Sequence, residues 1–208
     1  MNLLAIETAT ECCSVALACG ESLVLRSEFA PRRHAELLLP MCEQVLAEAG
    51  IGRHALDVIA VGVGPGAFTG VRLAVSAAQG LALALDRPLV PVSSLAALAM
   101  QAPDNGAAIL AVIDARMGEI YAGTFRRTAE GLVEPLGPES VGLAERLVLS
   151  AAATWNVVGS GWATYQALLE TRLPAAPAWV EGVAHPQASE VALTSAEQQA
   201  ARAERARG

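Results

Sequence analysis

The sequence predicts an α/β protein with mixed sheets flanked by helices, and three observations support this. The amino end has three consecutive strand-like segments separated by short polar turns. A buried, β-branched segment at 58–63 then leads through a glycine-rich loop into a long apolar helix. The same pattern of strands, acidic turn, strands and helix recurs after residue 106, without any repeat of the sequence itself. We therefore expect two lobes of similar design.

In the first half, apolar runs bounded by turn residues define the elements. Pro31 ends the third strand, Gly50 ends the first helix, and Thr69 can cap the second helix. Ser93 or Ser94 can cap the third helix. The expected strands are 3–6, 12–18, 23–29, 58–63 and 89–92, and the expected helices are 34–49, 71–85 and a short one ending at 100.

The second half begins after Pro103-Asp104-Asn105-Gly106, the most turn-rich stretch of the chain. We therefore place the domain boundary there, with domains at 1–102 and 103–208. The end of the chain, 196–208, lacks an apolar stripe and is expected to fray. The expected strands are 108–113, 120–125, 132–136 and 155–158, and the expected helices are 161–171 and one beginning near Pro186.

The glycine loop between 63 and 70 is the first candidate site. Gly64, Gly66 and Gly70 allow a sharp turn and a close approach to a neighbour, and a loop that opens a helix can bind an anion. A plain strand-to-helix turn explains the same residues without a ligand. The acidic turn at Glu7 and Thr8 could face a nucleotide or its metal ion, although its spacing alone favours a simple hairpin loop.

Composition excludes several classes of function. The chain has no lysine, which excludes a P-loop and any Schiff-base chemistry. Its net charge of −7, without a large basic cluster, argues against independent binding of nucleic acid. Arg72 and Gln79 interrupt the most apolar stretch, and the amino end lacks a signal peptide, so we expect a cytoplasmic protein without a membrane span. The four cysteines have no metal-binding spacing and are expected to be buried.

The first two helices have more apolar surface than one sheet face requires. The arc on the first helix covers about half of its circumference, more than the roughly 100° that would cover a sheet. The second helix carries a ridge of small residues at every fourth position, which permits close helix packing. Packing inside a single chain explains part of this surface, but we expect a helix-bundle interface between chains. Its predicted residues are Leu38, Met41, Cys42, Val45, Ala74, Ala78, Leu81 and Ala82.

Catalytic constellations are not evident in the sequence. His34, His54 and His185 lie far apart, and no serine occupies a nucleophile elbow. Paired carboxylates occur only in turns. We therefore expect no catalytic residue and no metal site, and a peptidase is disfavoured.

Five motifs together resemble the TsaB family, also called YeaZ, over most of the first 165 residues. They are AIETA at 5–9, HAELLLP at 34–40, GVGPGAFTGVRLAVSAAQG at 62–80, PVSSL at 91–95 and DARMGEIY at 114–121. The resemblance implies two ribonuclease-H-like lobes of the actin, sugar-kinase and heat-shock ATPase superfamily.

The resemblance also implies a function. TsaB is the non-catalytic partner of TsaD, which transfers a threonylcarbamoyl group to the adenosine 3′ of the anticodon in tRNAs that read codons starting with A (t6A modification). We expect a TsaD-like subunit bound through the first two helices, a TsaE-like ATPase in the complex, and only indirect contact with tRNA. A homodimer of the isolated chain is left open.

The resemblance also bears on bound groups. TsaD has two metal-binding histidines four residues apart, and the second position is Leu38 here, so no cofactor is expected in the isolated chain. ATP or ADP could bind within the complex, and Glu7, Thr8, Gly64 and Gly66 are the candidate nucleotide contacts. The alternative function is a small ATPase or kinase of the same superfamily that uses the Glu7 and Asp114 turns. The tail after His185-Pro186 departs from the family pattern, which puts its role in doubt.

Overall fold

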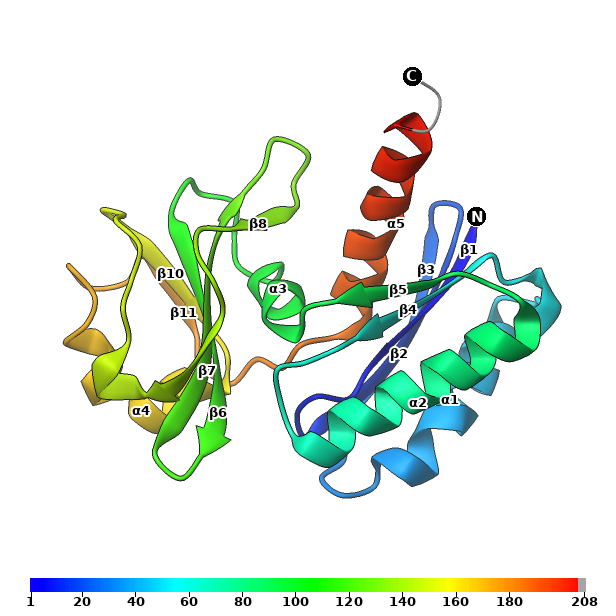
Figure 1. Cartoon of the computed structure of the whole chain (residues 1–208), viewed down its shortest axis with the longest axis horizontal. Helices are drawn as coiled ribbons and strands as arrows, with labels where there is room; N and C mark the ends of the chain where they lie inside the picture. The colour runs from blue at the N-terminus through cyan, green and yellow to red at the C-terminus, as the bar shows by residue number, and fades with distance from the viewer. Residues whose placement is uncertain (206–208) are drawn as a thin grey trace. The chain divides into compact units, whose positions relative to one another are not determined.

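The computed structural model describes the backbone of residues 1–205 and side chains up to residue 196. The chain forms two compact units, which Figure 1 shows with their elements labelled. Unit 1 contains Met1–Ala97 and Gln187–Gly208, and unit 2 contains Leu98–Pro186. The division differs from the expected boundary at 102/103, and the carboxyl-terminal segment belongs to unit 1 and not to the second half.

Unit 1 is built on a five-stranded sheet with the order β3-β2-β1-β4-β5. The first three strands form an antiparallel meander, and β4 and β5 extend it in parallel with β1. The strands are β1 (Asn2–Glu7), β2 (Cys12–Cys19), β3 (Ser22–Phe29), β4 (Val58–Gly62) and β5 (Leu89–Val92). All five expected strands of the first half are confirmed.

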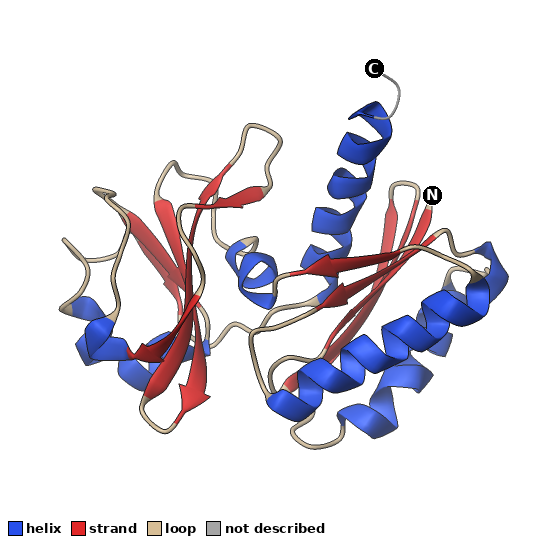
Figure 2. Ribbon diagram, viewed as in Figure 1, coloured by secondary structure: helices blue, strands red, loops and turns tan. Residues whose placement is uncertain are grey.

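Helices cover both faces of this sheet. Helices α1 (His34–Glu48) and α2 (Phe68–Leu85) lie on one face, where their buried residues form one cluster with β1, β2 and β4 (Figure 2). Helix α5 (Ala188–Arg205) packs on the opposite face. That face is lined by small side chains of the sheet, among them Ala5, Ala16 and Ala60, which let the helix approach closely.

Hydrogen bonds at the start of α5 attach this helix to the first sheet of unit 1. The Ala188 amide donates to Ser14 Oγ at 2.9 Å, and Ser27 Oγ donates to Gln187 Oε1 at 2.6 Å. Val191 then packs one turn further along the same face. We expected residues 196–208 to fray, but helix α5 continues to Arg205. The last three residues, and the side chains after residue 196, lie outside the described part of the chain.

Unit 2 repeats the topology of unit 1. Its sheet has the order β11-β10-β6-β7-β8; β6, β7 and β8 are antiparallel, and β10 and β11 run parallel to β6. The elements are β6 (Ala108–Arg116), β7 (Glu119–Arg127), β8 (Val133–Pro135), β9 (Ser140–Leu143), η2 (Ala144–Arg146), β10 (Trp155–Val158), α4 (Ser160–Glu170) and β11 (Trp179–Glu181). The repeated α/β design is confirmed, whereas β9 and β11 were not predicted.

Arg127 holds the start of unit 2 against its β7–β8 hairpin. Its guanidinium donates to the carbonyl oxygens of Gly131 at 2.6 Å and Ala102 at 2.7 Å, and also to that of Met100. Partial burial lowers the pKa of this arginine from its usual value. Buried backbone carbonyl groups need a hydrogen-bond donor. The Arg127 side chain supplies that donor to the carbonyl oxygens of Met100 and Ala102.

Short helix α3 (Ser94–Ala99) spans the division between the units. Ser93 caps it, because its Oγ accepts hydrogen bonds from the amides of Leu95 at 3.1 Å and Ala96 at 3.2 Å. The prediction of a serine cap is confirmed. Thr69, by contrast, does not cap α2, whose N-cap is Ala67 without any side-chain hydrogen bond.

Candidate functional site

The turn between β1 and β2 and the glycine loop are bound to each other through Glu7. Glu7 Oε1 accepts a hydrogen bond from the Ala9 amide at 2.6 Å, and Oε2 accepts one from Ser94 Oγ at 2.7 Å. Ser94 in turn makes two hydrogen bonds to the glycine loop, one as acceptor and one as donor. Its Oγ accepts from the Gly64 amide at 3.2 Å, and its own amide donates to the Gly64 carbonyl oxygen at 2.8 Å. Glu7 therefore anchors the glycine loop through a serine.

Two loop glycines are required by close approach to the same turn. A Cβ at Gly66 would lie closer than 3.0 Å to the Ala9 carbonyl, and a Cβ at Gly70 would clash in the same way with the Thr8 carbonyl. Thr8 Oγ1 donates to the Gly70 carbonyl oxygen at 2.8 Å. Positive φ is needed only at Gly64 in this loop, where it is +89°. The glycines thus serve mainly to pack two backbones together.

This packing corrects the expected nucleotide contacts. Glu7 and Thr8 are both fully buried, and their side-chain oxygens are bonded to the protein. Burial raises the pKa of Glu7 above its ordinary value, with the bonds from Ser94 and Ala9 acting in the opposite direction. Gly64 is buried as well, whereas Gly66 is partly exposed. Direct contact of the Glu7 or Thr8 side chain with a nucleotide does not fit this structure, and contact at the Gly66 backbone stays a prediction.

Ser94 is the residue of this cluster that sequence reasoning missed. It was considered only as a helix cap, but Ser93 makes the capping bonds and Ser94 points to Glu7. Its full burial next to an acidic turn cannot be read from local spacing, because Glu7 lies 87 residues away. The paired serines at 93 and 94 are the only signal that the sequence offers.

The second acidic turn is also occupied by internal bonds. Asp114 Oδ1 accepts hydrogen bonds from the Arg116 amide at 2.8 Å and from Tyr165 Oη at 3.2 Å, and Oδ2 is 3.3 Å from Arg116 Nη1. These contacts hold the β6–β7 hairpin, where Arg116 and Met117 both have positive φ. The carboxylates of Glu7 and Asp114 are thus both bonded to groups of the protein itself.

Other reactive groups are buried or dispersed. Burial raises the pKa of the Cys42 thiol to about 12 and that of Cys13 to about 11, with a neighbouring thiol adding to each shift. These thiols cannot supply a thiolate nucleophile near neutral pH. Among the described residues, no group of His, Cys, Asp and Glu side chains is arranged to hold a metal ion.

The side chains predicted for the partner interface lie inside unit 1. Leu81 is partly buried, and the other seven are fully buried in the core between the sheet and the two helices. The prediction assumed that a single sheet face could not absorb both apolar arcs. Helices α1 and α2 lie beside each other on that face, so each also covers the flank of the other (Figure 1). The small-residue ridge Ala74, Ala78 and Ala82 brings α2 close to its own sheet.

A different set of apolar residues faces outward on these helices. Phe68 is 70% exposed, Leu83 is 86% exposed, and Leu39 on α1 is 55% exposed. Arg72 lies over the Phe68 ring, with its guanidinium carbon 3.3 Å from the ring centroid. We call Phe68, Arg72, Gly80 and Leu83 the outer α2 face; all are exposed and lie along one side of the helix.

Helix α2 has more apolar surface than its packing inside unit 1 buries. Its 18 residues have a mean hydropathy of 1.4, and only 22% of them are buried. By length and composition this helix could cross a membrane, contrary to the expectation drawn from Arg72 and Gln79. Core helices of soluble proteins meet the same criterion, and three alanines of α2 belong to the core of unit 1.

Known proteins resemble this chain over most of its length. The family described as TsaD, tRNA N6-adenosine threonylcarbamoyltransferase, matches residues 27–205. The tRNA threonylcarbamoyladenosine biosynthesis protein TsaB of Escherichia coli is 40% identical over 167 residues, covering 78% of this chain and 72% of that protein. TsaB of Haemophilus influenzae is 38% identical over 190 residues, covering 83% of this chain and 78% of that protein.

A solved structure agrees with these relatives. YeaZ from Pseudomonas aeruginosa superimposes with a TM-score of 0.87 at 41% identity, and the match covers 98% of this chain and 93% of that one. The resemblance seen in the motifs thus extends to the fold over nearly the full length of the chain. On this combined sequence and structural similarity, the chain belongs to the TsaB (YeaZ) family.

Proposed function

We propose that the chain is a non-catalytic scaffold and activator subunit in tRNA threonylcarbamoyladenosine biosynthesis. Its partner is a TsaD-like catalytic subunit, which transfers the threonylcarbamoyl group to the adenosine 3′ of the anticodon. Relatives that carry the name of this pathway support the proposal. We further propose a cytoplasmic location, a TsaE-like ATPase as a third component, and contact with tRNA only through the partner.

The internal bonding of the acidic turns supports a non-catalytic role. In unit 1, Glu7 is enclosed by Ser94 and Ala9, and the loop that would approach a phosphate is packed against the β1–β2 turn. In unit 2, Asp114 is bonded to Arg116 and Tyr165. A catalytic carboxylate must reach its substrate directly or through a water molecule, and the bonds around these two favour structural roles.

The outer α2 face is the observation that carries the proposed partnership. Large exposed aromatic and aliphatic residues together with an arginine are the composition typical of interface centres. Phe68 and Leu83 lie at opposite ends of the helix, about four turns apart, so the face extends along its length. We propose that a helix of the TsaD-like subunit packs here, and that two copies of this chain use the same face when no partner is present.

The test compares two arginine substitutions on the same helix. Leu83→Arg places a charge on the outer α2 face, where burial by a partner would cost several kcal/mol. At about 1.4 kcal/mol per tenfold in Kd, affinity for the TsaD-like subunit should fall by at least a hundredfold. Ala78→Arg places the same charge in the core, so this variant should fail to fold.

Gel filtration and circular dichroism distinguish the outcomes. We expect Leu83→Arg to keep the wild-type spectrum and to elute without the TsaD-like subunit. A folded Leu83→Arg protein that still forms the complex would refute the proposed face. ATP hydrolysis by the isolated wild-type chain, lost in Glu7→Ala, would instead favour the alternative of a small ATPase.

A further inference from the structure

Strand β3 forms a long open edge of the sheet in unit 1. Its eight residues pair with β2 along their whole length and without a bulge. The other edge strands are short: β8 and β11 have three residues each, β9 has four, and β5 has four with Pro91 among them. Short length and proline keep a sheet edge from pairing with another chain. Strand β3 has neither protection.

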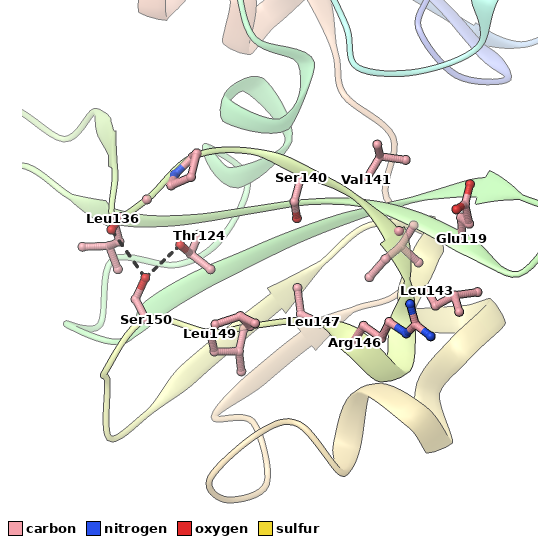
Figure 3. Close-up of a pocket in the computed structure, with 15 residues that line it drawn as sticks. Glu119, Thr124, Leu136, Ser140, Val141, Leu143, Arg146, Leu147, Leu149 and Ser150 are labelled. Atoms are coloured by element: carbon pink, nitrogen blue, oxygen red, sulfur yellow. Dashed lines mark hydrogen bonds between the residues drawn. The ribbon is translucent and has the colours of Figure 1, made fainter.

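Unit 2 shows the opposite treatment of an edge. Strand β8 pairs with 125–127 of β7, and β9 pairs with 119–122, so that residues 136–139 stand opposite 123–124 and bulge out of the ladder. The chain around this bulge lines a pocket beside β7 (Figure 3). A bulge of this kind interrupts the row of backbone groups that a further strand would need.

Backbone groups of alternate β3 residues point toward the open edge. The Ala30 amide donates to the Glu11 carbonyl oxygen at 2.9 Å, one step beyond the paired strands, so the even-numbered residues bond to the β2 side. Hydrogen-bonded and non-hydrogen-bonded pairs alternate in an antiparallel ladder. The amides and carbonyls of Leu25 and Ser27 are therefore directed outward. The Leu25 carbonyl oxygen agrees with this alternation, because the Arg26 guanidinium reaches it and donates to it at 3.0 Å.

The side chains of β3 are apolar on one face and charged on the other. Leu25 is 37% exposed and Phe29 is 65% exposed, and both lie on the same face because side chains alternate along a strand. Arg26 and Glu28 lie on the opposite face, where Arg26 forms an ion pair with Glu48 of α1. The strand thus offers both apolar and charged groups at its edge.

These groups are complementary to a second copy of the same strand in one register. Consider two β3 strands that run antiparallel about a twofold axis at Ser27. Arg26 of each copy then faces Glu28 of the other, which gives two opposite-charge pairs. On the other face of the sheet, Leu25 faces Phe29 of the other copy. An axis at Arg26 or at Glu28 would place like charges directly opposite each other, so charge selects the axis at Ser27.

We propose that β3 is an edge for self-association, on which a second copy of this chain adds its own β3 so that two five-stranded sheets become one continuous sheet. Hydrogen bonds within the chain are exchanged and not lost. An amide of the second copy replaces Arg26 Nη1 at the Leu25 carbonyl, and Nη1 turns to Glu28 of that copy. Arg26 Nη2 keeps its ion pair with Glu48.

The contact uses one strand from each copy, which makes it smaller than a standard protein interface. Small interfaces of this kind are weak, so we expect a Kd on the order of 100 µM. The edge is separate from the outer α2 face, and the proposal therefore does not depend on the proposed partner.

The test is sedimentation velocity of the full-length protein between about 10 and 500 µM. All proteins carry Leu83→Arg, so that the outer α2 face does not contribute. We expect a dimer that increases with concentration. Arg26→Glu and Glu28→Arg should each weaken it about tenfold or more, because like charges then face each other twice. Arg53→Glu, which reverses an exposed charge elsewhere in unit 1, is the control and should leave association unchanged.

Mixing the two reversed variants tests the register directly. In an equimolar mixture of Arg26→Glu with Glu28→Arg, every reversed charge meets its opposite on the other copy, so association should return to the level before reversal. A variant that had merely misfolded would not recover on mixing. Amide hydrogen exchange should also slow at Leu25 and Ser27 as the concentration rises, while the Arg26 amide, which points to β2, should not change.

Four results would overturn the proposal. They are a protein that stays monomeric at about 500 µM, charge reversals that leave association unchanged, a mixture that stays monomeric, and a loss in Arg53→Glu equal to that in Arg26→Glu. Binding of the TsaD-like subunit is measured separately, so none of these results bears on the outer α2 face.

Discussion

Gly70 and Gly80 on helix α2 provide a matched test of why the glycine loop needs glycine. Both residues are helical and both can be changed to alanine, but their surroundings differ. A Cβ at Gly70 would lie closer than 3.0 Å to the Thr8 carbonyl oxygen, which is backbone and cannot turn away. A Cβ at Gly80 would meet no heavy atom within 4 Å. The same substitution should therefore have opposite effects at the two positions.

The magnitudes follow from these contacts. Gly80→Ala should stabilise unit 1 by about 0.5–1 kcal/mol, the helix-propensity difference between the two residues. Gly70→Ala gains the same term but forces the β1–β2 turn away, at about 1–3 kcal/mol for overpacking. It also strains the hydrogen bond from Thr8 Oγ1 to the Gly70 carbonyl, and leaving that buried hydroxyl without a partner costs about 1–3 kcal/mol. We expect Gly70→Ala to destabilise by about 1–5 kcal/mol in total once the helix-propensity gain is subtracted.

Urea unfolding followed by far-UV circular dichroism measures both effects. The three tryptophans all lie in unit 2, so their fluorescence alone would not report on this change directly. A Gly80→Ala gain should raise Tm by about 2–4 °C for each kcal/mol. If Gly70→Ala proves as stable as Gly80→Ala, the glycine loop is not packed against the β1–β2 turn as described. The argument that Glu7 is enclosed by protein groups would then fail as well.

Three further predictions concern buried groups. Because burial raises the Glu7 pKa, wild-type stability should fall relative to Glu7→Gln as pH rises above 4.5 towards 7, and a pH-independent difference in urea unfolding would contradict this. Arg127→Met should lower the free energy of unfolding of unit 2 by about 2 kcal/mol, measured by tryptophan fluorescence. The control Arg126→Met, which removes a surface ion pair, should lower it by less than about 1 kcal/mol. Equal losses would refute the bonding role of Arg127. Cys13 and Cys42 should resist iodoacetamide in the native protein and react after unfolding, as peptide mass spectrometry would reveal, because both thiols are buried with raised pKa.

Local sequence patterns were sufficient for the elements and for the α/β class. Alternating and continuous apolar runs set the strands of both units, and glycine and proline set their ends, because these signals depend on neighbours within a few residues. The family motifs at 62–80 and 114–121 were likewise visible in the sequence. The short strands β9 and β11 escaped prediction because segments of 3 or 4 residues carry too little periodicity to be recognised.

Tertiary structure alone decided which apolar side chains are available to a partner. Helical spacing placed Ala78 on an apolar ridge but could not say whether a sheet of the same chain or another protein covers it. Contacts across long stretches of sequence settle that question: Ala78 packs in the core and Leu83 is left outside. In the same way, Glu7 is enclosed by Ser94, 87 residues further along, and α5 returns to the first sheet through Ser14. Burial is a property of the whole packed unit, and spacing within one element determines only which residues share a face.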